Sequence, residues 1–63
     1  MTAEEHYQEG QRLMRESRYT EAMNAFQRAI DSAPDSPAAT AARESRQMLA
    51  DIMAFYFKDL YNP

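Results

Sequence analysis

The chain has 63 residues, a net charge of −3 and no cysteine. This length allows one small domain at most, taken as residues 1–63, and the missing cysteines exclude disulfides and thiolate metal sites. An acidic chain lacks the basic surface that nucleic acids and anionic membranes attract. No apolar run approaches the roughly 20 residues of a membrane span, and the polar beginning MTAEEHYQEG is unlike a secretory signal. We therefore expect a cytoplasmic protein with no nucleic-acid or membrane partner.

The first predicted helix begins after Thr2. The sequence TAEE there matches a capping box, in which the Thr2 hydroxyl accepts from the Glu5 backbone and the Glu5 side chain reaches back to Thr2. Apolar residues then recur at spacings of three and four, as on one face of a helix. They are Tyr7, Gly10, Leu13 and Met14. The pattern breaks around Ser17, where we expect a turn.

The second predicted helix begins after Thr20, a residue type that is common at helix N-caps. Its apolar stripe has the same period as that of the first helix. It consists of Ala22, Met23, Phe26, Ala29, Ile30 and Ala33. Pro34 ends the helix, because the residue before a proline is disfavoured in helical conformation.

The third predicted helix begins with Ser36 as N-cap and Pro37 as the first helical residue. Nothing interrupts it up to about residue 61, so it is longer than the other two. Short turns between helices make them antiparallel neighbours. With no valine and only two isoleucines in the chain, strands are not expected. The sequence predicts an all-α fold: a helix–turn–helix hairpin over residues 3–34, then a longer third helix over 37–61.

The stretch YTEAMNAFQRAIDSAPDSP resembles a tetratricopeptide repeat. The residues in register with the pattern of that family are Gly10, Tyr19, Ala22, Phe26, Ala29 and Pro34. The resemblance covers roughly residues 3–36, with the helix over 37–61 as a capping helix, and the chain is similar to small bacterial proteins of this type. The first helix departs from the pattern, since His6 and Glu9 replace the usual large aromatic residue and leucine. The resemblance implies an α–α superhelix that mediates protein–protein interaction.

On a helical wheel, the third helix has a narrow stripe that is expected to pack on the hairpin. It consists of Ala38, Ala42, Ser45, Leu49, Met53, Tyr56 and Leu60. Phe55 and Phe57 fall on opposite flanks of this stripe. Because the helix is longer than the hairpin, its second half should project beyond it. We expect the chain to form a homodimer through this part, with an interface of Met48, Phe55, Phe57, Leu60 and Tyr61.

Four alternatives stay open. A bend near Met53 would fold the aromatic residues back over the hairpin and complete a monomeric core, or a different protein would cover them. The resemblance also implies a peptide-binding face on the first helix, which makes the chain a monomeric adaptor. That face consists of Glu4, Tyr7, Gln11, Met14 and Arg15. Finally, the chain is compatible with a purely structural mini-repeat, excised or designed.

No group of residues predicts catalysis. His6 is the only histidine, and with Glu5 and Glu9 beside it we expect a solvated cluster rather than a metal site. The chain has no glycine-rich phosphate loop and no plausible pair of nucleophile and base. We therefore expect no enzymatic activity, no cofactor and no bound metal.

Overall fold

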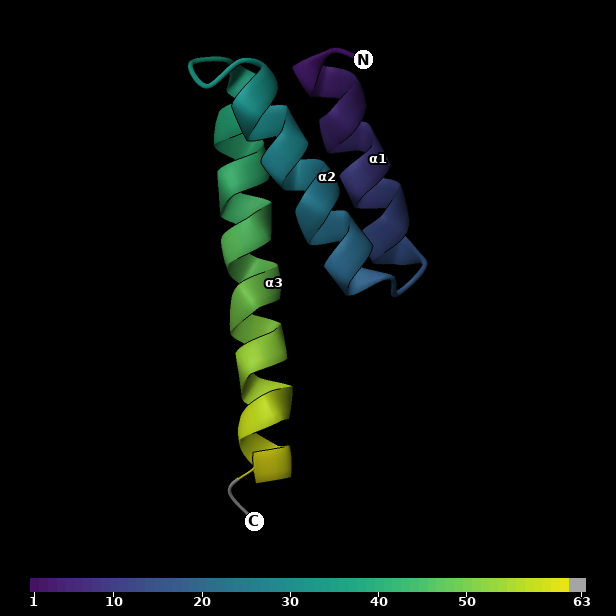
Figure 1. Ribbon diagram of the computed structural model, residues 1–63, viewed down its shortest axis with the longest axis vertical. Coiled ribbons are helices and arrows are strands. Elements are labelled where there is room, and N and C mark those ends of the chain that lie inside the picture. The colour runs from purple at the N-terminus through teal and green to yellow at the C-terminus, as the bar shows by residue number, and fades with distance from the viewer. Residues whose placement is uncertain (62–63) are drawn as a thin grey trace.

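The computed structural model describes the backbone of residues 1–61 and the side chains of residues 1–56. Its elements are α1 (Ala3–Arg15), α2 (Tyr19–Ser32) and α3 (Pro37–Tyr61), with no strand in this part of the chain. Helices α1 and α2 form an antiparallel hairpin, and α3 runs back alongside α2 (Figure 1). The predicted all-α fold, a hairpin followed by a longer third helix, is confirmed.

Two of the three predicted helix starts are confirmed. At α1 the Thr2 N–H donates to Oε1 of Glu5 at 3.0 Å, and the Glu5 N–H donates to Oγ1 of Thr2 at 3.2 Å. At α3 the Oγ of Ser36 accepts from the backbone N–H of Ala39 at 3.1 Å. Both hydroxyls thus satisfy backbone donors that a helix start leaves without an intrahelical partner.

The start predicted for α2 is wrong: the helix begins at Tyr19, with Arg18 as N-cap, so Thr20 lies inside it. The reason is the way α1 ends. Ser17 has a φ of 63°, and the N–H groups of Ser17 and Arg18 donate back to the carbonyls of Met14 and Leu13, at 3.0 and 2.9 Å. This pattern is a Schellman motif. It reverses the chain so tightly that α2 starts directly after it.

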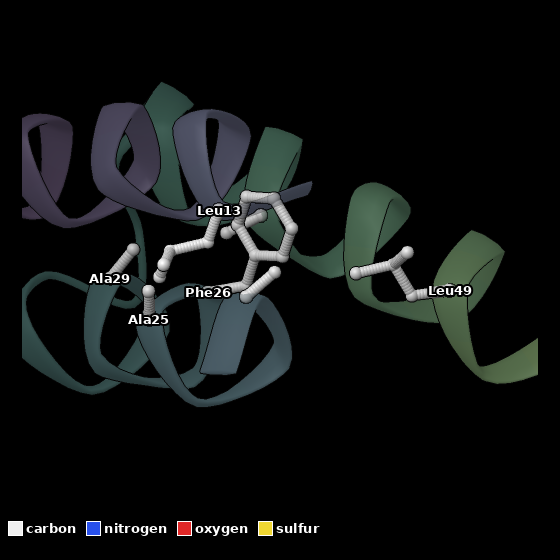
Figure 2. Packing of buried hydrophobic residues seen from close by; sticks show 7 residues of the cluster. Leu13, Ala25, Phe26, Ala29 and Leu49 are labelled. Atoms are coloured by element: carbon white, nitrogen blue, oxygen red, sulfur yellow. The ribbon is translucent and has the colours of Figure 1, made fainter. Parts of the chain in front are cut away.

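The core is centred on Phe26, which is fully buried (Figure 2). The buried cluster takes residues from all three helices: Leu13, Ala22, Ala25, Phe26, Ala29, Ala42 and Leu49. The predicted stripes of α1 and α2 are confirmed, with Tyr7, Met14, Met23 and Ile30 half-buried around the cluster. Ala25 and Ala39, which lie outside the predicted stripes, are also fully buried. Alanines line the places where the helices approach one another most closely.

Helix α3 extends well beyond the hairpin, as predicted (Figure 1). Leu49 is the last residue of the described side chains to be fully buried, and the helix continues unbroken to Tyr61. The bend considered near Met53 is therefore not found. Tyr56 lies on the stripe predicted to pack on the hairpin, yet 62% of its surface is exposed. That prediction is wrong because the hairpin ends before it reaches Tyr56.

Candidate functional site

The largest exposed apolar surface of the described residues lies on the second half of α3. It consists of Met48, Ile52, Phe55 and Tyr56, which are 47, 37, 65 and 62% exposed, and we call it the α3 apolar face. Steps of four, seven and eight residues place these side chains on one side of the helix. The rings of Phe55 and Tyr56 contact each other edge to face, with centroids 6.1 Å apart. Exposed apolar faces on soluble proteins are often interaction surfaces, so we take the α3 apolar face as the first candidate site.

The α3 apolar face includes part of the predicted dimer interface. Met48 and Phe55, two residues of that predicted interface, lie on this exposed face. The side chains of Phe57, Leu60 and Tyr61 lie outside the described residues. Sequence reasoning missed Ile52 and Tyr56 as surface residues. Both residues follow Met48 by four and eight positions, which places them on the same side of the helix as Met48. On the helical wheel, however, they also lie on or beside the stripe expected to pack on the hairpin.

A groove with a volume of about 610 Å³ lies between the start of α1 and the start of α3. We call it the α1–α3 groove. Most of its residues are small: Thr2, Ala3, Glu4, Tyr7, Ala33, Ser36, Pro37, Ala38 and Ala41. Sequence reasoning placed only Glu4 and Tyr7 at a candidate site. The groove residues come from α1, from the α2–α3 turn and from α3, so no single helical periodicity predicts the groove.

The five residues predicted for the first-helix face are brought only partly together. Glu4 and Tyr7 line the α1–α3 groove. The hydroxyl of Tyr7 accepts from Nε2 of Gln11 at 3.0 Å, so these two side chains are fixed to each other. Met14 packs against the core. Arg15 is exposed at the C-terminal end of α1, whereas the groove lies at the N-terminal end of this helix. Tyr7 also contacts Phe26, with ring centroids 5.7 Å apart, and therefore has a packing role.

Charged side chains pair with one another around the α1–α2 turn, at the hairpin end opposite to the groove. Arg12 bridges Glu9 and Glu16, while Arg18 bridges Glu16 and Glu21. Hydrogen bonds from Arg12 lower the pKa of Glu9. All of these groups are at least partly exposed, so the pairs contribute little to stability. None of these paired residues lines the α1–α3 groove or belongs to the α3 apolar face.

The acidic residues beside His6 have other partners. Glu5 belongs to the capping box at Thr2, whose backbone N–H lowers the pKa of the Glu5 carboxyl. Glu9 pairs with Arg12. Among the described side chains, no three His, Asp or Glu are placed to hold one metal ion. In the same part of the chain, no helix is long and apolar enough to cross a bilayer.

No protein-family model matches this chain, and neither curated proteins nor solved structures give a match. The fold and its surfaces therefore carry the functional argument. In the described residues these surfaces are the α3 apolar face and the α1–α3 groove of a small all-α chain.

Proposed function

We propose that this chain is a non-catalytic protein–protein interaction module of the tetratricopeptide type, and that it associates with itself through the α3 apolar face. The single observation that carries the proposal is the exposure of Phe55 and Tyr56, 65 and 62%, on a helix segment that no other described part of the chain covers. Large exposed rings are costly to leave in water, and they are typical anchors of protein interfaces.

We infer self-association because the described residues expose almost no other large apolar side chain that could cover this face within the same molecule. Apart from the α3 apolar face, the only large apolar side chain exposed among the described residues is Met1. A two-fold dimer buries the same residues on both copies and closes without open-ended growth. A second copy can therefore cover the α3 apolar face of each chain within one closed interface. The cysteine-free composition suits a reducing compartment, and a cytoplasmic location is part of the proposal.

Sedimentation equilibrium of the intact chain tests this proposal. From micromolar to millimolar concentration, the mass should rise from 7.3 kDa toward twice that value. Changing Phe55 and Tyr56 to serine should weaken the dimer at least tenfold, while the circular dichroism of the helices is retained. Gln47→Ser is the matched control, because Gln47 lies on α3 outside the apolar face. A mass of 7.3 kDa throughout the range would refute self-association.

The runner-up is a monomeric adaptor that binds an extended peptide on the first-helix face. The observation in its favour is the α1–α3 groove, which Glu4 and Tyr7 line. A peptide with an apolar side chain beside Tyr7 suits this groove. Glu4→Lys changes the charge at the groove without touching the core, since Glu4 is exposed. It should alter peptide affinity in this case and leave the mass in solution unchanged.

A further inference from the structure

We propose that two copies of the chain pair through α3 in antiparallel orientation along its whole length, so that Phe55 and Tyr56 of each copy enter the α1–α3 groove of the other. This inference rests on the proposed self-association and specifies its geometry. It joins the two surfaces described above, the groove and the α3 apolar face, into one interface.

One face of α3 connects the groove and the α3 apolar face. At about 100° per residue, one arc of roughly 100° holds residues from the groove to the end of the described side chains. In chain order they are Ala38, Ala41, Ser45, Met48, Ile52, Phe55 and Tyr56. The first three are small and the last four are large. The face therefore changes from a hollow at its start to a ridge at its end.

Antiparallel pairing matches the ridge of one copy with the hollow of the other. With a two-fold axis near Met48, Ser45 lies opposite the partner's Ile52, and Ala41 lies opposite the partner's Phe55 and Tyr56. Met48 is close to the middle of α3, which spans Pro37–Tyr61. The axis that matches large with small residues is thus also the one that gives the two helices their greatest overlap. Parallel pairing would instead set ridge against ridge.

The α1–α3 groove has room for the rings of Phe55 and Tyr56. Its volume of about 610 Å³ is in the range of pockets that hold a small ligand, and Ala38 and Ala41 form its α3 wall. Tyr7 forms part of the α1 wall and offers a ring for edge or offset packing. Aromatic side chains therefore suit the groove in both size and chemistry.

A stable dimer needs a large contact area. At roughly 200 Å² for each full ring side chain, exposures of 65 and 62% leave about 250 Å² of Phe55 and Tyr56 open to solvent. Specific interfaces bury about 800 Å² on each partner, so these two rings alone supply only about a third of that area. Pairing along the full helix adds the surface of the α1–α3 groove on both copies.

Disulfide cross-linking distinguishes these geometries, because the chain has no cysteine of its own. Met48→Cys and Ile52→Cys are a matched pair, since both side chains are exposed on the same face, one helical turn apart. A disulfide needs Cα atoms about 4.4–6.8 Å apart. With the axis near Met48, the two copies of residue 52 would be separated by roughly 12 Å along the helices, at about 1.5 Å per residue.

We expect Met48→Cys to form covalent dimers at least tenfold faster than Ile52→Cys under the same mild oxidation. Faster cross-linking of Ile52→Cys would overturn the proposed register in favour of contact between the projecting halves. Equal cross-linking of both variants would indicate parallel helices, and cross-linking of neither would place the dimer contact elsewhere; each contradicts the inference. Sedimentation of the unmodified chain tells these outcomes apart from a chain that does not dimerise, in which case the proposed function fails as well.

Discussion

The ring of Phe26 occupies the space that a side chain at Gly10 would need. A Cβ built on Gly10 would lie 2.5 Å from Cε1, 2.6 Å from Cδ1 and 2.9 Å from Cζ of Phe26. Such distances are far inside van der Waals contact. Phe26 is fully buried and also packs against Tyr7, so its ring has little freedom to move away. The close crossing of α1 and α2 therefore depends on the absence of a side chain at residue 10.

We expect Gly10→Ala to destabilise the fold, even though alanine favours a helix by about 1 kcal/mol over glycine. Forcing an extra methyl group into a packed core costs about 1–3 kcal/mol, and the backbone of two helices must shift to accept it here. Thermal unfolding followed by circular dichroism measures the effect. Adding Phe26→Leu should make the alanine at residue 10 better tolerated, giving a favourable coupling in a double-mutant cycle. A higher melting temperature for Gly10→Ala alone would contradict this account.

The left-handed turn at Ser17 offers a stabilising change. Its φ of 63° is a conformation that glycine adopts without the steric penalty of a Cβ atom. Ser17→Gly should therefore raise the free energy of unfolding by about 0.5–1 kcal/mol. Ser32→Gly is the matched control, because Ser32 is exposed and ends α2 in helical conformation. The same replacement there should be destabilising, and urea denaturation of the two variants gives the comparison.

The ends of α1 and α3 show which parts of the fold are predictable from the sequence. The capping box at Thr2 and the Ser36–Pro37 start depend on side chains that bond to nearby backbone, and such local chemistry is readable in the sequence. The start of α2 was not, because it follows from backbone hydrogen bonds around Ser17, where no glycine signals the turn. Thr20 has the side chain of a typical N-cap and yet lies inside the helix.

The candidate site was predictable to a similar, limited degree. A helical wheel gives the direction of each side chain but not the point at which the neighbouring helix ends. Leu49 and Tyr56 both lie on the stripe predicted to pack, yet Leu49 is fully buried and Tyr56 is 62% exposed. The exposure of Phe55 was expected from its direction alone. The groove beside Ala41 depends on how three separate segments meet, which no single periodicity encodes.

The contrast between Leu49 and Tyr56 gives a direct prediction. Leu49→Ala should reduce the free energy of unfolding by about 2–5 kcal/mol, since it removes a fully buried side chain from the core. Tyr56→Ala should change the stability of the dilute monomer by less than about 0.5 kcal/mol, because this residue makes no core contact. Chemical denaturation at micromolar concentration separates the two. A large loss for Tyr56→Ala would mean that its ring is folded onto the hairpin in solution.

Acidification should destabilise the fold through α1. The pKa of Glu5 is lowered from 4.5 by its hydrogen bonds with Thr2, and that of Glu9 is lowered from 4.5 by Arg12. Both groups therefore bind protons more readily in the unfolded chain, and stability falls as the pH falls. Their contribution is fully present above pH 4.5 and is lost as the pH passes below it, through the lower pKa values of the folded chain.

Melting temperatures between about pH 7 and about pH 2.5 measure this loss, since that range spans the ordinary pKa of glutamate. Glu5→Gln should reduce the decrease in melting temperature at low pH, because glutamine still accepts from the Thr2 N–H but does not titrate. Glu5→Ala is the informative control, since it removes the capping contact at every pH and should lower the melting temperature at neutral pH as well. If the melting temperature of Glu5→Gln falls with pH as steeply as that of the unmodified chain, other groups govern the acid destabilisation.

The last prediction concerns the α1–α3 groove as half of a dimer interface. Ala41→Arg would fill the groove with a long charged side chain, and an arginine is well tolerated in an α-helix. Because the partner's Phe55 and Tyr56 are proposed to enter there, the dimer should weaken at least tenfold in sedimentation equilibrium. Thr40→Arg adds the same side chain one residue earlier, at an exposed position that does not line the groove. It carries the same change in net charge and should leave association nearly unchanged. If both arginine variants weaken the dimer equally, overall charge rather than groove filling governs the contact. A loss confined to Ala41→Arg would show that the groove contacts the partner's Phe55 and Tyr56, which lie about four helical turns further along α3 than Ala41 does.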